Sequence, residues 1–223
     1  MRKITVILLF LIPFLLTAFA TVAYFKLTQK ISGISLPVLP TVTFSDLVKL
    51  SRFSLEKAPS ESLVGNITSM TGEVEYQNRM ATESAKIVSP VSVQQGESLT
   101  TGADGKFILN FKDAVELSAD SNSGIGIIQT LPINLVFWQT LGSVEYKKLG
   151  TDIVSIRVAH LIVQNDGDIQ ISFTKDSPIT TVVAINGTAT VAYNDTYNIS
   201  RIINIPSGKT LKFNEGNRRA VLE

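Results

Sequence analysis

The sequence predicts an all-β domain that follows a single N-terminal transmembrane helix. Three observations support this prediction: an uncharged apolar run at the start of the chain, period-two alternation of apolar residues from Leu63 onward, and the absence of helical periodicity in that same region. Strands without covering helices have to bury their apolar faces against other strands. We therefore expect a single β-sandwich or rolled β-sheet over residues 63–223.

The first predicted element is the apolar run. It extends from Ile4 to Phe25, contains 22 uncharged residues, and is preceded by Met1, Arg2 and Lys3. At about 1.5 Å per residue this run forms a helix of roughly 33 Å, which is enough to cross a hydrocarbon core of about 30 Å. Because the run is longer and bulkier than the apolar core of a cleaved secretory signal, we expect an uncleaved signal anchor.

A cleaved signal that releases a secreted domain stays open as an alternative. Ala18–Ala20 (AFA) resembles a cleavage site, and Pro13 kinks or shortens a helix that passes through it. For an anchor, the positive-inside preference is slight because Lys26 and Lys30 follow the run. Long domains translocate largely regardless of charge, so we expect residues 1–3 in the cytoplasm and the rest on the extracytoplasmic side, in the periplasm or at the cell surface.

Residues 26–62 form the predicted extracytoplasmic linker. Gly33, Pro37 and Pro40 argue against a helix that continues out of the membrane. Thr43–Leu55 has the pattern of a short helix with apolar residues partly on one face. Its polar face is only weakly basic, so an element packed on the domain or a mobile stalk fits better than a membrane-surface or partner-binding helix.

The β domain itself follows from alternation. Phe107–Phe111 and Asp113–Leu117 each place alternate apolar residues on one face, as expected for strands with one wet side. Val154–Val158 and Asp168–Phe173 repeat the pattern, and the second of these opens after the predicted turn Asn165–Gly167. Strands therefore recur along the whole domain.

A short sequence pattern that repeats within the chain, called the internal echo below, constrains the architecture. Gly72–Tyr76 (GEVEY) reappears as Gly142–Tyr146 (GSVEY) and, less closely, as Gly187–Val191 (GTATV), while Gly96–Leu99 (GESL) is echoed by Gly208–Leu211 (GKTL). A glycine before such a strand permits a positive φ or close passage of the backbone at a corner, and the alternate apolar residues that follow point inward. The spacing of the echoes is too irregular for a strict solenoid.

The run Val93–Ile125 resembles the core of the FecR-like domain. It contains the turn pattern G-(D/E)-x-L-x-T-G-x-(D/N)-(G/S) at Gly96–Gly105, followed by two strands and a serine-containing stretch. Asp113-Ala114 replaces the usual Asp-Gly hairpin of the family, which suggests a different turn or a bulge. Three further segments extend the resemblance to roughly Leu63–Leu222: Leu141–Val144, Val182–Val191 and Ile205–Leu211.

This resemblance implies a non-catalytic envelope module that mediates protein binding, signalling or envelope structure. The named regulators of the family control a sigma factor through a cytoplasmic segment, whereas we expect only residues 1–3 on that side. We therefore expect no anti-sigma activity by that route. The alternative function is a cell-wall carbohydrate-binding or glycan-hydrolysing domain.

Composition narrows the classes of partner and cofactor. The formal net charge is +1 and no run of Lys or Arg is longer than two residues, so we expect no nucleic-acid partner. The chain contains no cysteine, which excludes disulfides, thiolate metal sites and cysteine nucleophiles. We expect no cofactor, and the expected partners are the membrane and an envelope protein or polysaccharide.

The sequence assigns no catalytic, cofactor-binding or metal-ligating residue, and it leaves the ligand-binding residues unidentified. His160 is the only histidine, and a role as general base requires a carboxylate partner; a strand residue on the wetter face or at the sheet margin is the better interpretation. Asp120–Gly124 imitates the start of a calcium loop, but position twelve of that frame is Leu131 instead of a glutamate. Asn165–Asp168 is first a hairpin signal.

A glycoside hydrolase requires two acids about 5–9 Å apart across a cleft. The acids on predicted strands are Glu73, Glu75, Glu116 and Glu145. Their alternation with inward Val and Tyr residues is instead typical of a solvated strand face. Trp138 is the best single contact residue for a sugar or a protein, but the run Ile133–Gln139 is apolar on both sides, so we expect Trp138 in the core.

Overall fold

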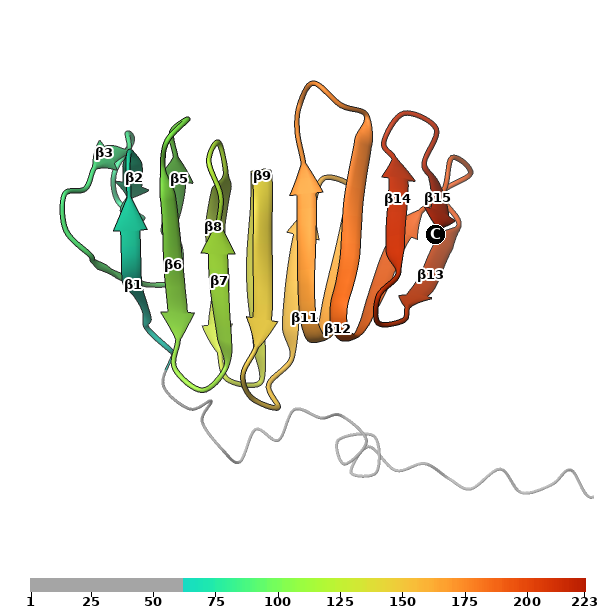
Figure 1. Ribbon diagram of the computed structural model, residues 1–223, viewed down its shortest axis with the longest axis horizontal. Coiled ribbons are helices and arrows are strands. Elements are labelled where there is room, and N and C mark those ends of the chain that lie inside the picture. Colours follow the sequence, from blue (N-terminus) through green and yellow to red (C-terminus); the bar gives the residue numbers. More distant parts are fainter. Residues whose placement is uncertain (1–61) are drawn as a thin grey trace, which may run out of the picture. The chain divides into compact units, whose positions relative to one another are not determined.

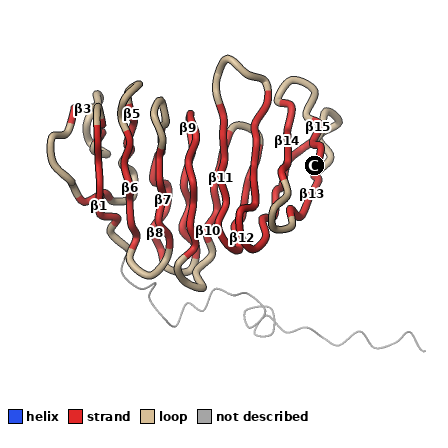
Figure 2. The backbone as a smooth tube through the Cα atoms, in the orientation of Figure 1, coloured by secondary structure: helices blue, strands red, loops and turns tan. Residues whose placement is uncertain are grey.

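The computed structural model describes residues 62–223, and every regular element in this part of the chain is a β-strand (Figure 1, Figure 2). The predicted all-β class is therefore confirmed for these residues. Within them, no helix is long and apolar enough to cross a membrane. The predicted transmembrane helix at residues 4–25 and the predicted short helix at Thr43–Leu55 lie outside the described residues, and the domain boundaries stay predictions.

Fifteen strands make up the described domain, and all of their pairings are antiparallel except that of β9 with β10. The strands are β1 (Gly65–Thr71), β2 (Val74–Gln77), β3 (Ala85–Lys86), β4 (Ser92–Val93), β5 (Ser98–Thr101), β6 (Lys106–Phe111), β7 (Val115–Ala119), β8 (Gly124–Leu131), β9 (Asn134–Lys148), β10 (Val154–Val158), β11 (Leu161–Phe173), β12 (Ile179–Asn194), β13 (Ser200–Ile205), β14 (Thr210–Asn214) and β15 (Arg219–Leu222).

Hydrogen bonds connect these strands into one sheet, which folds over into two facing layers (Figure 1). The first layer contains β4, β1, β6, β7, β14 and β15, and the second contains β3, β2, β5, β8, β10 and β13. The long strands β9, β11 and β12 belong to both layers. For example, the first half of β9 pairs with β8 and β10, and its second half pairs with β7 and β11. The predicted sandwich-like packing of strands on strands is thus confirmed.

Glycines mark the creases where the chain passes between layers. Gly142 in β9 has φ 85°, and a Cβ at this position would collide with Ser123. Gly187 in β12 has φ 74°, and a Cβ there would collide with the carbonyl oxygen of Asp166. The other echoed glycines share this conformation: Gly72, Gly96 and Gly208. The prediction that these glycines turn corners is confirmed.

The predicted hairpin turn at Asn165–Gly167 is wrong. These residues lie inside the continuous strand β11, at its crease, where Gly167 pairs with Gly187 of β12. The chain reverses instead at Ala159-His160, between β10 and β11. An Asp-Gly pair between two alternating runs predicts a break in the strand, but the break here bends the strand into the other layer and does not reverse it.

The Asp113-Ala114 departure from the family pattern still produces a hairpin. Asp113 has φ 58°, and the N–H of Ala114 donates to the carbonyl oxygen of Phe111 at 3.0 Å. Aspartate is one of the few residues other than glycine that adopts this left-handed conformation readily. β6 and β7 are therefore joined as neighbours in the first layer.

The inner faces of the two layers form the core. The alternation predicted for β6 and β7 is confirmed, because Phe107, Leu109 and Phe111 are buried together with Val115 and Leu117. Aromatic contacts run through the core: the ring centroids of Phe111 and Phe137 lie 5.4 Å apart, and those of Phe137 and Tyr146 lie 6.2 Å apart. Apolar burial between the layers is the main stabilising contribution to this fold.

One polar network is buried next to the crease of β9. The side-chain amide of Gln139 donates to the carbonyl oxygens of Gly142 at 2.9 Å and Ile171 at 3.0 Å. The hydroxyl of Tyr146 donates to Oε1 of Gln139 at 3.2 Å, and burial raises the pKa of Tyr146. Each buried polar group of this network is paired, which is the condition for burying it without a large cost.

Candidate functional site

The outer face of the second layer carries a continuous row of residues in cross-strand register. Six neighbouring strands, β8 to β13, contribute one outward position each. The members of this row, called the Trp138 row below, are Gly126, Trp138, Arg157, Ile162, Ala192 and Ile202. Residues at adjacent positions of neighbouring strands lie close enough for their side chains to form one surface.

The Trp138 row is exposed, and it is apolar except for Arg157. Trp138 is 47% exposed, Ile162 57% and Ile202 71%. These three side chains stand on alternate strands of the row, with Arg157 and Ala192 between them. Single apolar residues at a surface are ordinary, but large apolar side chains gathered on one sheet face form a patch, and such patches mark interaction sites. The row is therefore the leading candidate for a binding surface among residues 62–223.

The prediction that Trp138 belongs to the core is wrong. β9 alternates so that Leu135, Phe137 and Gln139 point inward, which puts Val136 and Trp138 on the outer face. The sequence misleads here because the inward position next to the crease is polar. Gln139 can occupy it only because the carbonyl oxygens of residues 142 and 171 accept hydrogen bonds from its side chain.

Arg157 lies beside the indole ring of Trp138. The guanidinium carbon is 5.9 Å from the ring centroid, which is within the range of a cation–π interaction. On the other side of β9, Gly126 of β8 is in register with Trp138 and has no side chain to cover the indole. Sequence reasoning missed Arg157 and Ile162 as surface partners of Trp138. The outward position of Arg157 between Ile156 and Val158 was visible in the alternation, but the parallel pairing of β10 with β9 was not.

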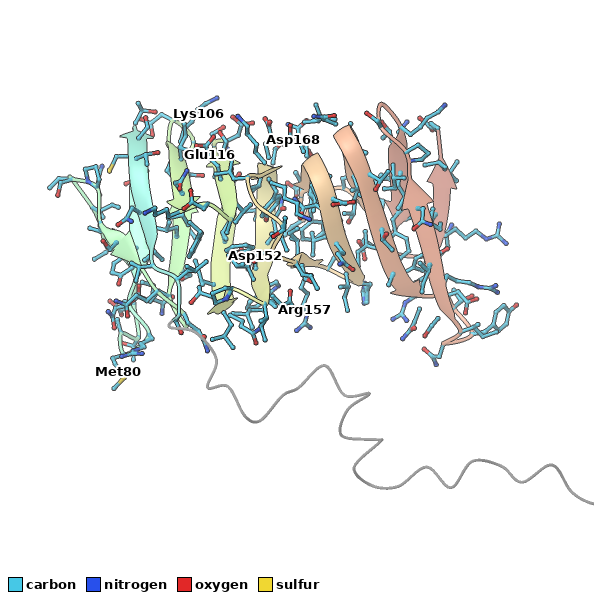
Figure 3. All side chains as sticks on the ribbon, turned by 90° about the horizontal axis from the view of Figure 1, so that it is seen from below. Met80, Lys106, Glu116, Asp152, Arg157 and Asp168 are labelled. Atoms are coloured by element: carbon cyan, nitrogen blue, oxygen red, sulfur yellow. The ribbon has the colours of Figure 1, made fainter. Side chains whose placement is uncertain are left out.

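The outer face of the first layer has a different character. In its corresponding row, Asn110, Glu116, Lys147 and Asp168 stand opposite one another on β6, β7, β9 and β11. Figure 3 shows Lys106, Glu116 and Asp168 on one side of the domain and Arg157 on the other. A polar face of this kind is what a solvated sheet surface presents.

His160 does acquire a carboxylate partner. It lies in the turn between β10 and β11, and its Nδ1 is 2.7 Å from Oε2 of Glu215, which follows β14. The other carboxylate oxygen of Glu215 accepts a hydrogen bond from the hydroxyl of Thr180 in β12. Because Glu215 stands between the imidazole and the hydroxyl, the imidazole is not placed to take the hydroxyl proton. The three residues tie the second layer to the first, in line with the predicted place at the sheet margin.

The four acids predicted on strands are divided between the two outer faces, and Glu73 lies immediately before β2 instead of within it. Glu73 and Glu75 lie beside a shallow pocket on the second layer, where Lys86 pairs with Glu73 at 3.5 Å and Ser84 donates to Glu75 at 2.6 Å. Glu116 and Glu145 occupy the first layer, on β7 and β9. The predicted alternation with inward Val74, Val144 and Tyr146 is confirmed. The structure thus brings Glu73 and Glu75 to one pocket, whereas Glu116 and Glu145 lie on the opposite outer face.

In each of the two calcium-like stretches one aspartate forms an ion pair with a lysine, whereas Oδ1 of Asn165 in the second stretch is buried without a hydrogen-bond partner among the described residues. Asp120 pairs with Lys106 at 2.8 Å, and Asp166 pairs with Lys148 at 3.0 Å. Residues 62–223 contain no group of three or more His, Cys, Asp or Glu side chains that could hold a metal ion.

The residues on which the FecR-like resemblance depends form hydrogen bonds that stabilise turns. The carboxylate of Glu97 is buried and accepts a hydrogen bond from the N–H of Gln94 at 2.7 Å. The hydroxyl of Thr101 donates to the carbonyl oxygen of Asp120 at 2.7 Å and accepts from the N–H of Ser123 at 2.8 Å. The Glu97 contact closes the turn before β5, and the Thr101 contacts join the end of β5 to the crossing between β7 and β8, so the motif has a structural role.

Comparison with known proteins gives limited similarity. No protein-family model matches the sequence, and no curated protein matches it. Two crystal structures of a candidate anti-sigma factor from Parabacteroides distasonis ATCC 8503, at 2.50 and 1.65 Å resolution, show similarity with TM-scores of 0.48 and 0.49 and 8% sequence identity. The matched region covers 56% of this chain and 58% of each crystallised chain. This chain therefore spans less than two thirds of their length, and the likeness assigns neither a family nor a partner.

Proposed function

We propose that this chain is a single-pass membrane protein whose FecR-like β domain lies on the extracytoplasmic side and binds another envelope protein without catalysis. The apolar run at residues 4–25 supports the anchor. The turn motif at Gly96–Gly105, with a positive φ at Gly96 and a buried Glu97, supports the FecR-like assignment. The Trp138 row is the single observation that carries the binding function.

The composition of the Trp138 row favours a protein partner. Tryptophan and arginine are enriched among the residues that dominate protein–protein binding energy, especially where apolar neighbours exclude water from them. Ile162 on β11 supplies such a neighbour, in register with Arg157, and Ile202 on β13 extends the apolar surface further along the row. A matching partner presents an apolar surface that covers the indole, and a carboxylate that pairs with Arg157.

Copurification from detergent-solubilised membranes tests this proposal. Trp138→Ala and Arg157→Ala in the full chain should each lose the specific partner protein. Val88→Ala is the matched control, because Val88 is 92% exposed and lies outside the row. Retention of the same partner by Trp138→Ala would contradict protein binding through this face.

A second candidate function, carbohydrate binding, is favoured by the same exposed indole beside a guanidinium. Sugars stack on exposed aromatic rings, and Trp138 is the only tryptophan in the chain, so intrinsic fluorescence reports on this site alone. Titration with soluble cell-wall fragments distinguishes the two candidates. A saturable change in Trp138 emission supports carbohydrate binding, whereas unchanged emission together with loss of the protein partner in Trp138→Ala supports protein binding.

The topology is tested separately. Protease added to spheroplasts of cells that express the full chain should digest the domain, and carbonate washing should leave the intact chain in the membrane fraction. Protection of the domain in sealed spheroplasts, with digestion after detergent, would contradict an extracytoplasmic location. A mature protein that starts near Thr21 would establish the cleaved, secreted alternative.

A further inference from the structure

A pocket separate from the Trp138 row lies at the end of the domain that β12 to β15 form. The turn between β12 and β13, residues 195–199, belongs to the second layer, and the turn between β14 and β15, residues 215–218, belongs to the first. Residues of both turns enclose a pocket of about 330 Å³ between the edge strands β13 and β15. In Figure 1 these strands form the red end of the domain.

The pocket is positively charged. Arg201, Arg218 and Arg219 line it, and Asp195 is the only acidic residue in its lining. Asp195 pairs with Arg201, whereas no ion pair forms between Arg218 or Arg219 and any carboxylate of residues 62–223. The lining therefore holds two guanidinium charges that no protein carboxylate compensates within the described part of the chain.

Asp195 positions the side chain of Arg201. Its Oδ1 accepts hydrogen bonds from the N–H groups of Tyr197 at 2.9 Å and Ile199 at 3.0 Å, and its Oδ2 accepts from Nε of Arg201 at 3.1 Å. The hydrogen bond from the Ile199 N–H, followed by Arg201, lowers the pKa of Asp195, so this carboxylate stays ionised. Because the ion pair uses Nε, the two Nη groups of Arg201 stay free for a ligand.

Arg218 has a left-handed backbone conformation, which is unfavourable for an arginine. Its φ is 48°, although Gly216 and Asn217, which tolerate a left-handed conformation far better, precede it in the same turn without positive φ. Side-chain hydrogen bonds impose this arrangement: Oδ1 of Asn214 accepts the N–H groups of residues 216 and 217, and Oδ1 of Asn217 accepts the N–H of Arg219. Backbone outliers of this kind cluster at ligand-binding sites.

The remaining lining adds aromatic surface. Tyr193 is held edge-on against Phe213, with ring centroids 5.0 Å apart, and Tyr197 is 82% exposed at the rim. Arginine forks recognise carboxylate and phosphate oxygens in a bidentate geometry, and tyrosines contact the organic part of such ligands.

We propose that this pocket binds a small organic oxyanion, namely a phosphate ester or a polycarboxylate. The site is separate from protein binding through the Trp138 row, and neither proposal depends on the other. Arg201 and Arg218 approach the anion from the two layers, so a bound ligand joins the turns of β12–β13 and β14–β15.

Calorimetric titration of the full chain in detergent tests the proposal with four probes: glucose 1-phosphate, citrate, inorganic phosphate and glucose. We expect saturable binding of at least one organic anion, weaker binding of inorganic phosphate, and none of glucose. Binding of glucose 1-phosphate alone identifies the phosphate ester as the ligand, and binding of citrate alone identifies the carboxylate. Absence of saturable binding of all three anions up to about 10 mM, or equal binding of glucose, overturns the proposal.

Two variants connect the binding to the pocket. Arg218→Gly removes a guanidinium while relieving the left-handed backbone, so it keeps the turn folded, and we expect about tenfold weaker binding or more. Lys212→Ala removes a positive charge from β14 outside the pocket and should leave the affinity within about twofold. An unchanged affinity in Arg218→Gly, or an equal loss in both variants, overturns the assignment.

Discussion

The two outer faces of this domain are built from the same long strands, yet they present opposite surfaces. On the first layer, the row through Glu116 and Lys147 is polar and charged. On the second, the row through Trp138, Arg157 and Ile162 is apolar around one cation. Because β9 contributes to both faces, the difference arises from residue choice and not from the type of strand. A sheet face that contacts only water is typically polar, and the apolar character of the second face therefore supports the proposed binding function.

The largest expected effect on the free energy of unfolding distinguishes an inward residue of β9 from an outward one. Phe137→Ala leaves a cavity between the layers and should lower the free energy of unfolding by about 3–5 kcal/mol. Trp138→Ala, one residue later, should cost at most about 1 kcal/mol, because its side chain is half exposed. Urea denaturation of both variants measures the difference. Equal losses would show that Trp138 is a core residue and would remove the distinction between the faces.

The next largest effect on stability is expected at Gly187, where β12 passes from one layer to the other. Gly187→Ala forces a Cβ against the backbone of β11 at a positive φ and should cost about 2–4 kcal/mol. Gly208→Ala is the matched control, since Gly208 has φ 76° but nothing within 4 Å of the added Cβ, and it should cost about 1 kcal/mol. Thermal unfolding in which both variants lose the same stability would argue against a tight crease at residue 187.

A smaller effect depends on pH. Tyr146→Phe removes the hydrogen bond to Gln139 and should cost about 1 kcal/mol at pH 7. Burial raises the pKa of Tyr146 in the folded state, so its contribution to stability is complete below the unfolded pKa of about 10 and is lost as the pH rises further. At pH 11 this linkage removes about 1.4 kcal/mol from the wild type and nothing from the variant.

The stability gap between wild type and Tyr146→Phe should therefore close or reverse between pH 7 and pH 11 in urea denaturation. A gap that stays constant would show that Tyr146 ionises as freely in the folded chain as in the unfolded chain.

The smallest effect is expected on the polar face. Lys147→Ala on the first layer should change stability by no more than about 0.5 kcal/mol, because the side chain is exposed and paired only across strands. It should also leave copurification of the partner unchanged, unlike Arg157→Ala on the second layer. Loss of the partner in Lys147→Ala would extend the binding surface to both faces.

Local pattern was sufficient to predict much of the fold. The inward residues of β6 and β7 follow from alternation, and the corner glycines at positions 142 and 187 follow from the internal echo, because both signals are contained in a few neighbouring residues. Long-range pairing was not predictable in this way. Asn165–Gly167 has the chemistry of a reversal, and only its pairing with β12 makes it a crease.

The candidate sites depend on such distant contacts even more strongly. Trp138 points outward because the inward side chain of Gln139 donates a hydrogen bond to the carbonyl oxygen of Ile171, which is 32 residues away in the sequence. Arg157 lies beside the indole because β10 pairs in parallel with β9. The pocket lined by Arg201, Arg218 and Arg219 brings together two turns that are about twenty residues apart in the sequence. The separate residue types were visible in the sequence, but their proximity was not.

Site-specific photo-crosslinking in intact cells tests the central claim most directly. A photoreactive residue at Ile162, in the Trp138 row, should give a discrete protein adduct that disappears when Trp138→Ala is added, while the same residue at Ser118, on the outer face of the first layer, should give no such adduct. Adducts of equal yield from both positions, or none from Ile162, would contradict binding through the second layer.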